Sequence, residues 1–211
     1  GVPASGITYQ WKADGTNIAG ATGATYTLTN AEVGKAITVV ANYTDSRSTA
    51  ETVTSLATSA VTNTNDAGSI AISGTATQGQ TLSTTITDPD GVPASGITYQ
   101  WKADGTNISG ATSSTYTLTN AEVGKAITVV ANYTDSRSSP ETVTSLATGA
   151  VTNANDAGSI AISGTATQGQ TLTTNITDPD GVPASGITYQ WKADGTNIAG
   201  ATGATYTLTN A

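Results

Sequence analysis

Short runs of alternating apolar and polar residues, separated by turn residues, make up most of the chain. Between Ile97 and Ala103, for example, the apolar residues Ile97, Tyr99 and Trp101 alternate with polar ones, as they do in a strand with one buried face. One full period of the pattern predicts seven strands, at residues 69–77, 81–87, 97–103, 106–111, 115–119, 127–134 and 142–151. Seven short strands in about 90 residues are typical of an all-β sandwich.

Two local signals interrupt these strands. The dipeptide Asp104-Gly105 is a tight hairpin signal between the third and fourth predicted strands. Helical periodicity is almost absent, apart from one predicted helical turn at residues 120–125, which Asn120 would cap and Gly124 would end. Both signals fit short connections between strands.

The pattern recurs with a period of 90 residues, so that Gly1 aligns with Gly91 and Gly181. Residues 1–65 differ from residues 91–155 at seven positions, and residues 181–211 repeat residues 1–31 without change. We therefore predict a partial domain at 1–65 without its first two strands, a complete domain at 66–155, and a partial domain at 156–211 without its last two strands. Because the first copy begins in mid-repeat, we expect the sequence to be a window from a longer protein.

The predicted architecture is a series of tandem immunoglobulin-like β-sandwich domains of about 90 residues, arranged end to end. Trp101 in the third strand occupies the place of the buried tryptophan of immunoglobulin-like domains. We expect Trp101, Tyr99, Tyr116 and Tyr133 to form the core. The incomplete first and third copies would leave sheet edges open, so either neighbouring molecules complete each other's sandwiches or the window is an arbitrary cut from a periodic array.

Composition narrows the possible chemistry. The chain has no Cys, His, Met or Phe, which excludes disulfides, thiol and imidazole catalysis, and Cys/His zinc sites. Its net charge is -8 at pH 7 with only 7 scattered Lys and Arg residues, so no nucleic acid partner is expected. The apolar runs are too short for membrane insertion. We expect no enzyme activity and no small-molecule substrate, because the remaining nucleophiles lack an evident activating base.

Running the predicted strands alternately down and up brings five acidic residues to one pole of the complete copy. They are Asp66 in the entry linker, Asp88 and Asp90 in the loop after the second strand, and Asp135 and Glu141 around the loop after the sixth strand. Carboxylates so close together would repel one another unless a cation neutralised them, and Ca²⁺ takes six to eight oxygen ligands. The sequence therefore predicts a calcium site here. The alternative is that Asp-Pro-Asp-Gly is ordinary turn chemistry.

Several motifs in this order resemble a known family. They include "ITYQWKADGTNISGAT", "TYTLTNAEVGKAITVVANYTD", "AVTNANDAGSIAISGTATQGQTL" and "DPDG". Together they resemble the tandem immunoglobulin-like extender repeats of giant bacterial adhesins of the repeats-in-toxin, biofilm-forming type. The resemblance covers the whole chain. It implies an extracellular location at the bacterial cell surface, export by type I secretion, and calcium at the linkers between repeats.

The resemblance extends the set of expected calcium ligands to the other copies. The carried-over positions are Asp66 and Asp156 in the linkers, Asp88, Asp90, Asp178 and Asp180 in the acidic loops, and Asp45 and Asp135 in "YTD". Many family members have Gly after "YTD", whereas this chain has Ser136 and Arg137. We expect Arg137 to pair with a carboxylate, which would weaken the ligand role of Asp135 and Glu141.

The expected function is that of a structural extender, or spacer, whose repeats project a terminal binding domain away from the cell. Its partners would be the neighbouring repeats of the same chain. The alternative is a multivalent module that binds carbohydrate or matrix through weak identical sites.

Overall fold

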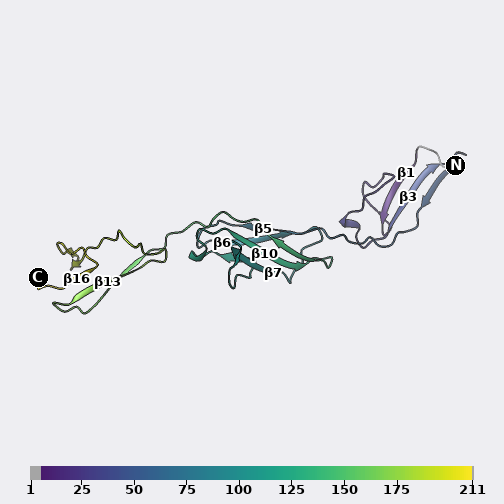
Figure 1. The fold of residues 1–211 in the computed structure, drawn as a ribbon. Coiled ribbons are helices and arrows are strands. Elements are labelled where there is room, and N and C mark those ends of the chain that lie inside the picture. The colour runs from purple at the N-terminus through teal and green to yellow at the C-terminus, as the bar shows by residue number, and fades with distance from the viewer. Residues whose placement is uncertain (1–5, 211) are drawn as a thin grey trace. The chain divides into compact units, whose positions relative to one another are not determined.

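A computed structural model describes residues 6–210, and over this range the fold is all-β (Figure 1). Gly1–Ser5 of the first predicted domain and Ala211 of the third lie outside the described residues. The strands form antiparallel pairs, interrupted by two short 3₁₀ turns, η1 (Asn30–Glu32) and η2 (Asn120–Glu122). The predicted all-β class is confirmed. No helix within the described range is long and apolar enough to cross a lipid bilayer.

The middle copy of the repeat contains two sheets. Its strands are β5 (Ser69–Ser73), β6 (Thr81–Thr87), β7 (Thr98–Ala103), β8 (Thr106–Asn107), β9 (Thr115–Thr117), β10 (Ile127–Thr134) and β11 (Pro140–Thr144). One sheet has the order β11-β10-β7-β8 and the other the order β5-β6-β9. Alternate residues of β10 are buried, and Leu82 of β6 and Trp101 of β7 are fully buried. One face of each sheet is therefore withdrawn from water, as the predicted β-sandwich requires.

The first and third copies each show part of this pattern. The first copy contains β1 (Thr8–Ala13), β2 (Thr16–Asn17), β3 (Ile37–Thr44) and β4 (Ala50–Thr54), in a sheet of order β2-β1-β3-β4. The third contains β12 (Ser159–Ser163), β13 (Thr171–Thr177), β14 (Lys192–Ala193), β15 (Thr196–Asn197) and β16 (Thr205–Thr207). Its sheets have the orders β12-β13-β16 and β14-β15. The sheet of the first copy thus corresponds to the β11-β10-β7-β8 sheet of the middle copy, and the three-stranded sheet of the third copy corresponds to the β5-β6-β9 sheet.

Backbone contacts divide the chain into two compact units that do not follow the repeat boundaries. The first unit is Gly1–Ala71, Thr84–Gln100 and Val129–Leu146, and the second is Ile72–Ser83, Trp101–Thr128 and Ala147–Ala211. The domain boundaries at 65/66 and 155/156 therefore stay predictions. All the residues of the acidic pole of the middle copy belong to the first unit.

The predicted hairpin at Asp104 and Gly105 is confirmed, since both residues have positive φ angles, of 46° and 79°. The predicted cap of the helical turn is wrong. The N-cap of η2 is Thr119, whose side chain accepts from the backbone while Glu122 reaches back to Thr119, which together form a capping box. Thr29 and Glu32 form the same capping box in the first copy. The side chains of Asn30 and Asn120 are therefore not used as caps and can reach other parts of the chain.

Candidate metal centre

Three acidic side chains meet at one pole of the middle copy, and we call Asp88, Asp135 and Glu141 the acidic cluster. Asp88 follows β6, Asp135 follows β10, and Glu141 is the second residue of β11. One carboxylate oxygen from each lies within 4.8 Å of those of the other two. Asp135 and Glu141 are buried and Asp88 is half-buried. The predicted convergence of these three residues is present, while their role as metal ligands stays a prediction.

The two carboxylate oxygens of Asp135 differ, because one accepts hydrogen bonds and the other has no hydrogen-bond partner among the described residues. Its Oδ1 accepts hydrogen bonds from the main-chain N–H groups of Arg137 and Ser139, both at 2.8 Å, which fixes the turn after β10. Its Oδ2 is buried and has no hydrogen-bond partner among the described residues. Burying an unsatisfied charged acceptor costs on the order of several kcal/mol. This oxygen therefore keeps its full capacity to accept a hydrogen bond or to coordinate a cation.

Asp88 is held by Tyr133, a core residue of β10. The Tyr133 hydroxyl donates to Asp88 Oδ2 at 2.7 Å, and the Asp90 N–H donates to Asp88 Oδ1 at 2.8 Å. Burial raises the pKa of Tyr133 well above its usual range, and the hydrogen bond to Asp88 and the charges of Asp88, Glu141 and Asp135 raise it further. Tyr133 therefore stays a neutral donor that orients Asp88.

Glu141 is tied to the linker that precedes β5. The Asn65 side chain donates to Glu141 Oε1 at 2.7 Å, and the Gly68 N–H lies 3.4 Å from Oε2. Gly68 also lies so close to the cluster that an added Cβ would overlap the Tyr133 hydroxyl and lie 2.8 Å from Asp88 Oδ2. The absence of a side chain at position 68 is therefore what allows the linker to pass directly over the acidic cluster.

The charges of the acidic cluster fit a hard cation. Two carboxylates about 4 to 5 Å apart repel each other by on the order of 3 to 4 kcal/mol at an effective dielectric constant of 20. All three groups offer oxygen, the ligand type that Ca²⁺ and Mg²⁺ use in proteins. A carboxylate has about four lone-pair positions, so the existing hydrogen bonds leave acceptor capacity on each residue. Asp88, Asp135 and Glu141 could together hold one such ion.

Asp90 has a different environment from Asp88, two residues away. Its Oδ1 accepts from Asn30 Nδ2 at 2.7 Å, and its Oδ2 accepts from the Asp66 N–H at 2.8 Å and from Asn63 Nδ2 at 3.2 Å. We call Asp90, Asn30, Asn63 and Asp66 the Asp90 network. The network joins η1 of the first copy and the linker to the acidic loop of the middle copy. Hydrogen bonds from N–H donors to the Asp90 carboxylate therefore connect the two repeats.

These donors also set the charge state of Asp90, which is 3% exposed. The hydrogen bond from the Asp66 N–H lowers the pKa of Asp90 most, followed by that from Asn30, and the Arg137 charge adds to the effect. Asp66 itself is exposed, and its carboxylate lies 3.4 Å from Asn30 Nδ2. The structure thus places Asp66 and Asp90 in the Asp90 network and apart from the three-carboxylate cluster.

Arg137 lies beside the same network. Its guanidinium donates to the main-chain oxygen of Asn30 at 3.0 Å. The contact joins the loop after β10 to η1 of the first copy. The expected interaction of Arg137 with a carboxylate is present as an electrostatic effect, because its positive charge contributes to lowering the pKa of Asp90.

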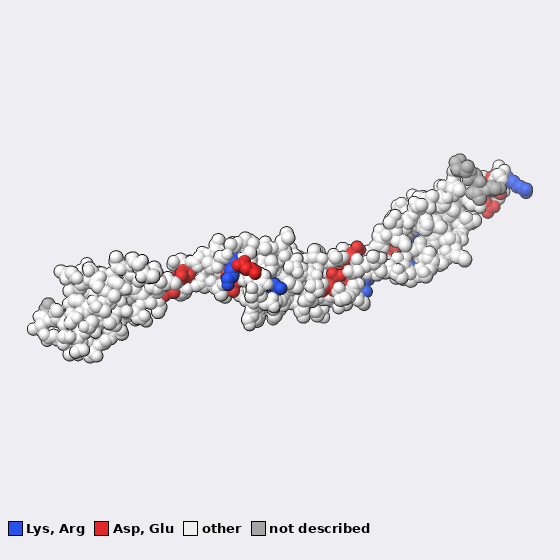
Figure 2. Space-filling model, viewed as in Figure 1, with Lys and Arg blue, Asp and Glu red and all other residues white. Residues whose placement is uncertain are grey.

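The other predicted ligands lie in incomplete versions of the site. Asp45 accepts from the N–H groups of Arg47 and Thr49, as Asp135 does in the middle copy. In the third copy the Asp156 N–H donates to Asp180 Oδ2 at 2.8 Å, and the Asp180 N–H donates to Asp178 Oδ1 at 2.8 Å. Within residues 6–210, the acidic cluster of the middle copy is the one group of three that could hold a metal. Figure 2 shows the acidic side chains in small separate groups, one of them where the linker enters β5.

Several residues of the site carry no charge and were missed by the sequence analysis. Asn30, Asn63 and Asn65 supply amide donors, Gly68 supplies space, and Tyr133, predicted as core, supplies a hydroxyl. The asparagines of the linker "VTNTN" were the available signal, because amide side chains beside aspartates are natural hydrogen-bond partners.

Comparison with known proteins gives little further identification. No protein-family model matches the chain. No curated protein matches it in sequence. Solved structures similar to it include one described as a Ca²⁺-stabilised adhesin that helps an Antarctic bacterium reach out and bind ice. The identity to it is 15% and the TM-score is 0.33, and the alignment covers 82% of this chain and 49% of that chain. The chain therefore spans about half the length of this structural neighbour.

Proposed function

We propose that this chain is a structural spacer made of tandem β-sandwich repeats and stiffened by calcium at the junctions between them. The observation that carries the proposal is the link between the acidic cluster and the linker. Asn65 and Gly68 bind Glu141, so the same residues that connect the first copy to the middle copy also contact the cluster. An ion bound there would fix the path of the linker.

The residues of the junction would divide the work. Asp88, Asp135 and Glu141 would hold the ion, and Tyr133 would keep Asp88 turned toward it. The ion would supply the positive charge that Asp135 Oδ2 lacks. The Asp90 network would hold the two copies together by hydrogen bonds whether or not the ion is bound. Calcium would thus tighten a junction that is already formed.

The biological setting follows from the resemblance described above. We infer that the chain belongs to the extender region of a large adhesin on the surface of a bacterium, where it projects a terminal binding domain. Near-identical copies suit a spacer, which needs repetition and no variation of its surface. In this setting the repeats act on no substrate, and their partners are neighbouring repeats. Extracellular calcium modules bind with dissociation constants of about 10⁻⁴ to 10⁻³ M, so the junction would respond to export from the cell.

We expect calcium to narrow the range of orientations at the junction between the first and middle copies. The chain has no cysteine, so Ala19→Cys and Thr85→Cys place one spin label on each side of the junction, both at exposed positions of the first unit. The distribution of distances between the labels, measured by pulsed electron resonance, should be narrow in calcium and broader in EDTA. The same labels on an Asp135→Asn background should give one distribution in both buffers. Equal widths for the unsubstituted junction in calcium and EDTA would refute the proposal.

A further inference from the structure

The edge strand β11 of the middle copy runs into a β-bulge where it ends. It lies beside β10, and the pairing with β10 continues past its last residue. The Ser145 N–H donates to the Val129 oxygen at 3.0 Å, and the Thr148 N–H donates to the Ile127 oxygen at 2.9 Å. Two steps along β10 therefore lie opposite three steps along the facing segment, so one residue is extra. The chain leaves the sheet within this step, where Leu146 is 90% exposed.

Two hydroxyl groups hold the bulge in place. The Val129 N–H donates to Ser145 Oγ, and the Ile127 N–H donates to Thr148 Oγ1, both at 3.0 Å. In a regular antiparallel ladder these N–H groups would bind main-chain oxygens of the facing strand. Val129 and Ile127 are fully buried, so an unpaired N–H there would cost on the order of 1 to 3 kcal/mol. The hydroxyls therefore allow the facing segment to turn away without leaving a buried donor unpaired.

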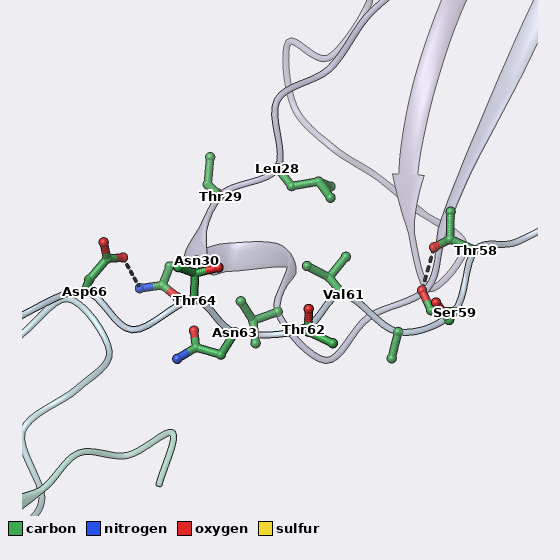
Figure 3. Close-up of a pocket in the computed structure, with 12 residues that line it drawn as sticks. Leu28, Thr29, Asn30, Thr58, Ser59, Val61, Thr62, Asn63, Thr64 and Asp66 are labelled. Atoms are coloured by element: carbon green, nitrogen blue, oxygen red, sulfur yellow. Dashed lines mark hydrogen bonds between the residues drawn. The ribbon is translucent and has the colours of Figure 1, made fainter. Parts of the chain in front are cut away.

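The first copy has the same bulge after β4. The same four hydrogen bonds, at 2.9 to 3.0 Å, join Ser55 to Val39 and Thr58 to Ile37. The Thr58 hydroxyl also donates to the Ser59 oxygen at 2.7 Å, which Figure 3 shows as a dashed line. Leu56 is 95% exposed. The bulge is therefore a property of the repeat, encoded by the sequence Ser-Leu-Ala-Thr in both copies.

The part of β11 that precedes the bulge has an open edge. The positions that bind β10 alternate along the strand, and Ser145 is one of them, so the main-chain groups of Val143 and Glu141 also face β10. The main-chain N–H and C=O groups of Thr142 and Thr144 consequently point away from β10. Because β11 is the last strand in the order of its sheet, these groups could pair with a further strand.

This open edge is short because both of its ends are unsuited to pairing. Pro140, the first residue of β11, has no N–H group to donate. At the other end the bulge takes the chain out of the ladder. The first copy has Ala50 in place of Pro140, so the bulge is the feature that both copies share. The groups that a second strand could bind are thus limited to those of Thr142 and Thr144.

We propose that the bulge keeps the edge of β11 from pairing with the same edge of another copy of the repeat. The need for it follows from repetition, because β4 and β11 have the sequences AETVT and PETVT and present nearly the same edge. Two such edges could pair antiparallel, within one chain or between chains. Open edges are templates for association of this kind, and bulges and edge prolines shorten them. The partner that the bulge excludes is therefore a second copy of the same strand.

Deleting Leu146 tests the proposal, because the deletion removes the extra residue and lets the strand continue along β10. The variant also carries Pro140→Ala, which introduces the residue of the first copy. All measurements use the full chain in EDTA, so that they are independent of any calcium site. Sedimentation should give the monomer mass for the parent chain, and for the variant a mass that rises with concentration to about twice that value. Adding Thr142→Pro should restore the monomer mass, because it removes an outward N–H group that β10 does not use.

Leu146→Ser is the matched control for the deletion. It removes the exposed apolar side chain and keeps the length of the bulge, so we expect a monomer at every concentration. Circular dichroism shows whether each variant is folded, and deletion of Ala147, which also shortens the bulge by one residue, replaces the first deletion if that variant unfolds. A folded deletion variant that stays monomeric would overturn the proposal. Self-association of the parent chain, or association of the variant that Thr142→Pro leaves unchanged, would overturn it as well.

Discussion

Replacing Gly68 with alanine is expected to lower the stability of the chain by about 1 to 3 kcal/mol and to remove its response to calcium. The added methyl group would overlap the Tyr133 hydroxyl and press on Asp88 Oδ2. Overpacking of a closed site costs roughly 1 to 3 kcal/mol. The linker could relieve the overlap by moving away, which would separate Asn65 and the Gly68 N–H from Glu141. Thermal unfolding followed by circular dichroism, with calcium and with EDTA, measures both effects.

Gly149→Ala is the matched control for this substitution. An added Cβ at Gly149 meets no atom within 4 Å, its φ is not positive, and the first copy has Ser59 at the equivalent position. We expect its unfolding midpoint to stay close to that of the parent chain in both buffers. If Gly68→Ala also behaved in this way, the close passage of the linker over the acidic cluster would have no energetic significance.

Replacing Asp135 with asparagine should raise the stability of the chain in EDTA and remove its further stabilisation by calcium. In EDTA the substitution removes one of three crowded charges, and the amide keeps an oxygen for the N–H groups of Arg137 and Ser139. Its NH₂ group also places a donor where the bare Oδ2 stands, so stability should rise by on the order of 1 to 3 kcal/mol. Calcium should add no stability to the variant, because one ligand is lost. Unfolding midpoints in both buffers give the comparison.

Asp45→Asn provides a control with the same local turn. Asp45 accepts from the N–H groups of Arg47 and Thr49, but it belongs to no group of three carboxylates among the described residues. We expect Asp45→Asn to shift stability by less than about 0.5 kcal/mol in either buffer, as is usual for a surface substitution. If Asp135→Asn and Asp45→Asn had the same small effect, Asp135 would be an ordinary turn residue.

The strands that the sequence predicted best are those whose pattern is uninterrupted. The predicted strands at 81–87 and 127–134 coincide with β6 and β10. The first predicted strand was too long, because β5 ends at Ser73 and Gly74 follows with a φ of 115°. Residues 25–27 show the limit of local reasoning, since the same tripeptide is a strand only in the copies that provide a partner. Whether such a segment at the edge of a sheet becomes a strand depends on its pairing with a segment distant in sequence.

Part of the candidate site was also predictable from the sequence. Alternating strand directions were enough to bring Asp88, Asp135 and Glu141 to one pole, because antiparallel strands fix which loops lie together. The separation of Asp88 from Asp90 was not predictable. It depends on Asn30, whose side chain reaches Asp90 because Thr29, and not Asn30, caps the turn. A one-residue error in the cap therefore concealed the hydrogen bond from Asn30 to Asp90, although the junction itself was predicted.

Calcium titration of the full chain by isothermal calorimetry would show whether the acidic cluster binds an ion. We expect one ion per chain of 211 residues, because the acidic cluster is complete only once among the described residues. With a dissociation constant of about 10⁻⁴ M, 10 mM calcium should also stabilise the folded chain by about 2.7 kcal/mol. Asp135→Asn should abolish binding and Asp45→Asn should not. Absence of binding and of any shift in unfolding at 10 mM calcium would show that the acidic cluster is not a calcium site.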